Sequence, residues 1–115
     1  MARYEIKSIV GENCITKEGG QTIYESIFPD LNNGLSVELD FQGCAIFASL
    51  FFNSAIGKLL AHFKSDRLNE LLDIKNLSED GRSVLLRVIN NAKKYYSDDE
   101  MRKAQDQAVN EEMEE

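Results

Sequence analysis

Apolar and polar positions alternate most clearly between residues 35 and 41, where apolar residues occupy every second place. This period of two is typical of a β-strand with one buried face. Gly43 ends the pattern. From Ser49 to Phe63 the apolar residues recur at steps of three and four, which predicts a helix. Residues 35–63 are therefore expected to form a strand, a glycine turn, a short apolar run and a helix.

Weaker patterns before this segment predict further elements. Alternation over residues 3–10 predicts a first strand, and residues 14–16 predict a short second strand. Residues 16–20 are polar and contain two glycines, which predicts a loop ahead of a helix. The apolar positions of that helix reach Phe28, and Pro29 is expected to end or kink it because proline lacks a backbone donor.

The chain after the Ser49 helix predicts two more elements and a strand between them. Residues 65–72 predict a short helical turn, and residues 73–77 alternate as a strand. Ser78, followed by two acidic residues, is a favourable cap for a helix with an apolar stripe. Strands and helices in this order predict an α/β fold, with a mixed sheet of about four strands and helices packed on it.

The predicted domain covers residues 1–96, and its length is sufficient for one hydrophobic core without disulfides or metal ions. No run of about 18 apolar residues occurs, so no membrane-spanning segment is expected. The N-terminus lacks the apolar stretch of a signal peptide. A cytoplasmic protein is therefore expected, with Cys14 and Cys44 as reduced thiols and a disulfide between them as the minor alternative.

Acidic residues are concentrated near the C-terminus. Residues 97–115 contain eight of them against Arg102 and Lys103, and so carry six of the seven net negative charges. A capping box at Ser97 and Glu100 predicts a last helix with few apolar positions, so this tail is expected to be a marginal helix or disordered. Without a clustered basic face, the chain is not expected to bind nucleic acid or an anionic membrane surface.

Three residues of the 35–63 segment are candidate site residues. Ser49 begins the predicted helix, where serine commonly caps a helix and where a phosphate would be stabilised by the helix dipole. Capping and phosphorylation both remain open for it. Asp40 ends the polar face of the strand, and either caps a loop or belongs to a partner-facing patch. Phe51 is an interface anchor if exposed and a core residue if buried.

The polar residues Thr16, Lys17, Glu18 and Gly19 precede a helix, a place where an anion can bind. They lack the glycine density of a P-loop, and the alternative is a solvated loop. The lone His62 and the absence of a Cys-x-x-Cys pair predict no metal site. No set of residues supplies a nucleophile, a base and a stabilising group, so neither enzyme activity nor a cofactor is expected.

Several of these segments resemble known families. The strand end Leu39-Asp40-Phe41-Gln42-Gly43, followed by Ser49 at a helix start, is similar to the STAS domains, the fold of bacterial anti-sigma factor antagonists. In those domains an Asp and a Gly at the strand end precede a phosphorylated serine. The resemblance implies that Asp40 and Gly43 occupy the strand-end positions and that Ser49 is the phosphorylation site.

A closer resemblance is to the STAS-like domains of unknown function described under the number 4325. It covers about residues 4–96 and includes the 16–20 loop, the LDF-x-G strand end, the helix start at Ser49, the Ala-Ile-Gly-Lys-Leu segment at 55–59 and the Asn-Leu-Ser junction at 76–78. Where the antagonists usually have Asp-Ser-Ser-Gly, this chain has Ala48-Ser49-Leu50-Phe51, so the carboxylate, the second serine and the glycine of that motif are missing. A kinase that recognises those groups in the antagonists would find fewer of them around Ser49.

The resemblance implies a non-catalytic regulatory module that binds a protein partner through a face containing Asp40, Gly43 and Ser49. Phe51, as the candidate interface anchor, is assigned to the same face. The implied partner is an ATP-binding regulator of the histidine-kinase-like fold, such as an anti-sigma kinase, with association gated by phosphorylation of Ser49. The alternative is a sensor domain that holds a nucleotide or another anion at residues 16–19 and at the Ser49 helix. The sequence leaves the identity of the partner and the oligomeric state open.

Overall fold

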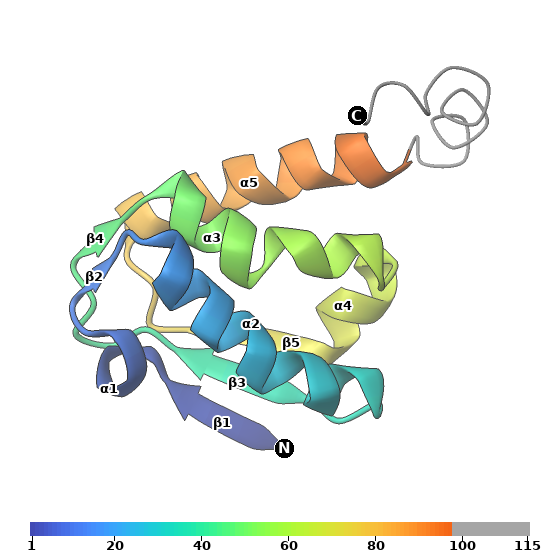
Figure 1. Cartoon of the computed structure of the whole chain (residues 1–115), viewed down its shortest axis with the longest axis horizontal. Coiled ribbons are helices and arrows are strands. Elements are labelled where there is room, and N and C mark those ends of the chain that lie inside the picture. Colours follow the sequence, from blue (N-terminus) through green and yellow to red (C-terminus); the bar gives the residue numbers. More distant parts are fainter. Residues whose placement is uncertain (98–115) are drawn as a thin grey trace.

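Three parallel strands form the sheet on which the main helices pack. β3 (Val37–Asp40) lies in the centre, and β1 (Ala2–Glu5) and β5 (Leu72–Lys75) pair with it on either side. This sheet lies in the lower part of Figure 1, which shows a computed structural model whose described part is residues 1–97. Parallel neighbours require long crossover connections, and the helices supply these.

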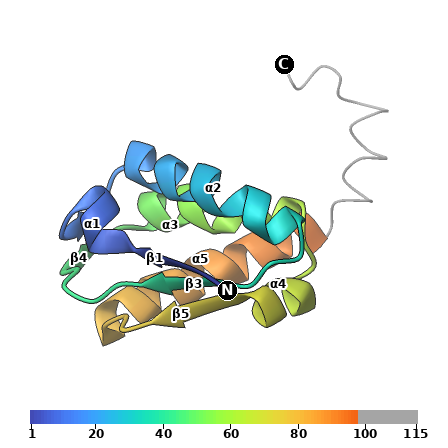
Figure 2. The same cartoon turned by 90° about the horizontal axis from the view of Figure 1, so that it is seen from below.

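Helices cover one face of the sheet. Figures 1 and 2 show α2 (Lys17–Asn32), α3 (Ser49–Ala55) and α5 (Glu79–Ser97) on the same side of the three strands. α2 lies in the crossover from β1 to β3 and α3 in that from β3 to β5, and right-handed crossovers that add strands in one direction place their helices on one face. α5 follows β5. The smaller elements are the helices α1 (Ile6–Val10) and α4 (Ser65–Leu71), the 3-10 helix η1 (Gly57–Ala61) and the strands β2 (Asn13–Cys14) and β4 (Ile46–Phe47).

The α/β class is confirmed. The strands form two separate sheets, whereas a single sheet of about four strands was expected. Five strands form two sheets, because β2 and β4 pair only with each other, and each pairing in residues 1–97 is parallel. The strand at residues 46–47 was not predicted. Two residues are too few for a visible alternation, and the pairing with β2 depends on chain segments that are far apart in sequence.

The ends of three elements differ from the sequence predictions. The expected strand at 3–10 ends at Glu5, where its partner β3 also ends, and Ile6 and Val10 then face the core from one side of α1. α2 continues past Pro29 to Asn32, because burial of Leu31 compensates for the one donor that proline removes. The expected helix at 49–63 ends at Ala55 and resumes as η1 after Ile56, whose φ of −123° is not helical.

A cluster of phenylalanine rings holds α3 over the sheet. Phe52 is fully buried and its ring centroid lies 5.9 Å from those of Phe41 and Phe47 and 5.5 Å from that of Phe51. Phe41 follows β3 and Phe47 belongs to β4, so the rings connect both sheets to the first turn of α3. This packing fixes the position at which α3 begins.

Within residues 1–97, each helix is too short or too polar to span a lipid bilayer. The predicted last helix that starts at Ser97 falls largely on residues 98–115 and lies outside the described residues, although Ser97 itself ends α5.

Candidate functional site

The start of α3 follows directly from the small β2–β4 sheet. The N–H of Ala48 donates to the carbonyl oxygen of Cys14 at 3.0 Å, which extends the ladder by one bond beyond Phe47. Ala48 is the N-cap, so Ser49 is the first residue of α3 and does not cap it, contrary to the expected capping role. The Ser49 residue is partly exposed.

Exposed apolar side chains lie around Ser49. Cys14 pairs with Phe47 and both face the interior, so Ile46 points to the opposite, outer face of the β2–β4 sheet. Ile15 directly follows Cys14, whose carbonyl oxygen accepts from the Ala48 N–H. Ile15 is 41% exposed and Ile46 is 54% exposed. Leu50, directly after Ser49, is 53% exposed. We call Ile15, Ile46, Ser49 and Leu50 the α3-start surface. The sequence analysis missed its three apolar members, because their exposure depends on how β2, β4 and α3 pack and no local pattern reports it.

Phe51 does not belong to this surface. Its side chain is 1% exposed and packs in the phenylalanine cluster, so its placement on a partner-facing surface is wrong and it is a core residue. Helix geometry explains the difference, since neighbouring residues on a helix point about 100° apart and Leu50 and Phe51 therefore face different sides.

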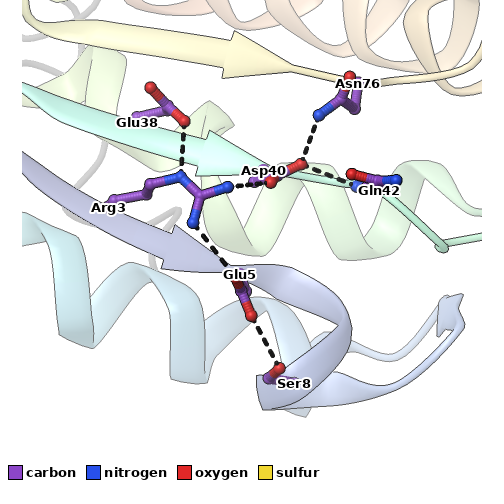
Figure 3. Close-up of polar contacts among 7 residues, drawn as sticks. All are labelled: Arg3, Glu5, Ser8, Glu38, Asp40, Gln42 and Asn76. Carbon is purple, nitrogen blue, oxygen red and sulfur yellow. Dashed lines mark hydrogen bonds and ion pairs between the residues drawn. The ribbon is translucent and has the colours of Figure 1, made fainter.

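Asp40 lies on the open face of the three-stranded sheet, within a polar cluster shown in Figure 3. Its carboxylate accepts hydrogen bonds from the Asn76 side chain at 2.8 Å and from the backbone N–H of Gln42 at 3.0 Å, and it is paired with Arg3. The residue is 5% exposed, so Asp40 links strand ends and caps a loop. The expectation that Asp40 belongs to an exposed partner-facing patch is therefore wrong.

Arg3 connects the rest of the cluster. Its guanidinium donates to Glu38 at 2.9 Å and to Glu5 at 3.2 Å as well as to Asp40. Arg3 pairs in register with Glu38, and Glu5 with Asp40, so the cluster joins β1 to β3. The hydrogen bonds from Asn76 and from Gln42 hold the pKa of the Asp40 carboxyl below its usual value, and the charge of Arg3 acts in the same direction.

Gly43 has a local structural role. It adopts a φ of +87°, which side chains disfavour, in a turn closed by a 3.0 Å hydrogen bond from the Cys44 N–H to the Phe41 carbonyl oxygen. A Cβ at this position would also lie 2.7 Å from Cδ of Lys7. Gly43 therefore directs the chain from β3 toward β4.

Residues 16–19 form the first turn of α2, and the expected loop is not present. Thr16 is the N-cap, and its hydroxyl accepts a hydrogen bond from the Gly19 N–H at 2.9 Å. The hydroxyl of Ser54 donates to the carbonyl oxygen of Lys17 at 2.9 Å, which ties α3 to this turn. The glycine pair that suggested a loop instead permits close packing of α2 against α3.

The two cysteines are free thiols. Cys14 is fully buried, and burial raises its pKa to about 12, so it stays protonated near neutral pH. Burial also raises the pKa of the half-buried Cys44. Among residues 1–97, no three His, Cys, Asp or Glu side chains gather in an arrangement that could hold a metal ion.

Comparison with protein families gives a match that covers more than half of the chain. The model of the STAS-like domain of unknown function (DUF4325) matches residues 19–82. The chain belongs to this family. The matched range includes Asp40, Gly43, Ser49 and Phe51, whereas Thr16, Lys17 and Glu18 lie before it. No curated protein and no solved structure matches the chain.

The charge of Asp40 should stabilise this STAS-like domain in a pH-dependent way. An unfolded Asp titrates near pH 3.9, and the folded Asp40 has a lower pKa, so its contribution is complete above that pH and is lost as the pH falls through the folded value. Asp40→Asn should be less stable than the wild type at pH 7, and this difference should shrink below about pH 4. Urea unfolding at several pH values measures it.

Asp66→Asn, which removes an exposed carboxylate from α4, is the control for loss of one negative charge. An equal difference between wild type and Asp40→Asn at pH 7 and at pH 3 would show that the charge of Asp40 contributes nothing to stability.

Proposed function

We propose that this STAS-like domain is a non-catalytic regulatory module that binds a protein partner through the α3-start surface. The observation that supports this most directly is the exposure of Ile15, Ile46 and Leu50 around a partly exposed serine. Apolar side chains rimmed by polar groups are typical of protein-binding sites. Asp40 and Gly43 support the site indirectly, because they shape the strand end and the turn that lead to it.

We infer the partner class from the resemblance to anti-sigma factor antagonists. The expected partner is an ATP-binding protein of the histidine-kinase-like fold, and the expected gate is phosphorylation of Ser49. A phosphate on Ser49 would add between one and two negative charges beside Leu50. An apolar interface would have to desolvate that charge, so phosphorylation is expected to weaken the association.

The sensor alternative, with an anion held at residues 16–19, receives less support. The Gly19 N–H and the Thr16 hydroxyl already bond to each other, and the Lys17 carbonyl oxygen accepts from Ser54. These groups serve helix capping and helix packing, and a ligand there would have to compete with both.

Titration with purified kinase-like ATP-binding proteins from the same genome tests the proposal. Leu50→Ser should weaken binding by about tenfold or more, because burial of a leucine side chain contributes roughly 1.5–3 kcal/mol. Leu86→Ser is the matched control, since Leu86 lies on α5 and is also 53% exposed. Calorimetry or interferometry gives the dissociation constants, and circular dichroism checks that both variants fold.

The same titration tests the gate. Ser49→Asp should weaken binding about tenfold while Ser49→Ala binds like the wild type, because only the aspartate brings a charge into the apolar surface. Equal affinities for both Ser49 variants would exclude the phosphorylation gate. Equal losses for Leu50→Ser and Leu86→Ser would exclude the α3-start surface as the binding site, and lack of binding to any such ATPase would exclude the partner class.

A further inference from the structure

A groove with a volume of about 680 Å³ lies between the segment that joins η1 to α4 and the last turns of α5. Its position is at the right of Figure 1, where the end of α5 passes the corner between η1 and α4. The volume is within the range of sites that hold small organic ligands. Six of the lining residues are aromatic or carry a basic group: His62, Phe63, Lys64, Lys93, Lys94 and Tyr96.

Two aromatic side chains that line this groove, His62 and Phe63, pack against a residue of α2. The ring of Phe28 on α2 packs against that of Phe63, with centroids 5.7 Å apart, and against that of His62 at 5.3 Å. Tyr96 lies on the opposite side, on α5. Because the rings of His62 and Phe63 are already packed, a flat ligand would lose little free energy in ordering them.

The basic side chains come from both walls. Lys64 lies on the η1–α4 segment, and Lys93 and Lys94 lie on α5. A smaller apolar hollow of about 90 Å³ adjoins the groove and shares Leu60, Ser65 and Lys93 with it. The described part of the chain is nearly neutral in formal charge, so the ammonium groups of Lys64 and Lys93, one from each wall, give this groove a local positive charge in an acidic protein.

We propose that this groove binds a nucleotide, with the base against Phe63 and Tyr96 and the phosphates beside Lys64 and Lys93. Flat rings bind a base by stacking, and ammonium groups bind phosphate oxygens as point charges. The groove shares no residue with the α3-start surface, so this site is separate from the proposed partner-binding function. An acidic peptide would also satisfy the lysines, but the packed rings and the hollowed shape favour a compact, flat ligand.

Calorimetric titration of the full chain with ADP tests the site. ADP should bind at least about tenfold more tightly than adenosine alone or pyrophosphate alone, because each of these fragments keeps only one of the two kinds of contact. Lys93→Gln and Lys64→Gln should each weaken ADP binding by about tenfold, through loss of one charged contact.

Arg87→Gln is the control, because Arg87 is exposed on the same helix as Lys93 and lies outside the groove lining. It should bind ADP like the wild type. The proposal is overturned if ADP does not bind, or if pyrophosphate binds as well as ADP. It is also overturned if Arg87→Gln loses as much affinity as Lys93→Gln, or if a synthetic peptide of residues 98–115 binds while ADP does not. Since none of these variants touches Ser49, failure here leaves the partner-binding proposal intact.

Discussion

Replacement of Phe51 by alanine should lower the free energy of unfolding by about 4 kcal/mol, a typical loss for a buried phenylalanine. The side chain is 1% exposed and contacts the fully buried Phe52, so its removal leaves a cavity in the cluster that joins both sheets to α3. The stability of a domain of this size is roughly 5–15 kcal/mol, so the variant would be marginal. Urea unfolding followed by circular dichroism measures the change.

Leu50→Ala is the control for this prediction. Leu50 is the neighbouring residue on the first turn of α3 and is 53% exposed, so its truncation should change stability by no more than about 0.5 kcal/mol. A small loss for Phe51→Ala would mean that the side chain is accessible, and would restore it as a candidate interface anchor.

Substitution of Gly20 by alanine should destabilise the protein by about 3 kcal/mol, because the added methyl group has no room between α2 and α3. A Cβ at this position would lie 2.4 Å from the Phe51 carbonyl oxygen and 2.7 Å from Cβ of Ser54. The first of these atoms belongs to the backbone, so α2 and α3 would have to move apart. The same shift would strain the hydrogen bond from Ser54 to Lys17.

Gly19→Ala provides the comparison, one residue earlier in the same helix. Its Cβ would meet side-chain atoms, the nearest being the Thr16 hydroxyl oxygen at 2.9 Å, so the loss should be about 1 kcal/mol, comparable to loss of a helix cap. Thermal or urea unfolding of both variants measures the difference. Similar losses at the two positions would show that helix packing does not limit the residue at Gly20.

Strong local periodicity identified the elements that the structure confirms. The alternation at 35–41 contains β3, and the apolar stripe after Ser78 contains α5, with the Ser78 hydroxyl accepting from the Gly81 N–H at 3.1 Å. Local rules failed where burial outweighed them. Pro29 remains inside α2 because the following turn buries Leu31, and the glycines at 19–20 belong to a helix because α3 packs on them.

The candidate site was predicted only in part, because local patterns do not show how distant segments pack. Ser49 was correctly placed at a helix start, but the sequence could not show that Ala48 takes the cap position. It assigned Phe51 to the partner-binding face on the condition that the side chain is exposed, and the packing of the phenylalanine rings shows that it is buried. The role of Asp40 likewise became apparent only from its partners in distant parts of the chain, Arg3 on β1 and Asn76 directly after β5.

The sequence by itself determined the α/β class, the strand at 35–41, the helix start at Ser49 and the family, since these depend on periodicity and on motifs within short segments. Tertiary structure alone decided which side chains share a surface. Cys14 and Phe47 are 33 residues apart in sequence and lie opposite each other because β2 and β4 pair in a particular register. That register arises from the packing of the whole core, and no local pattern encodes it.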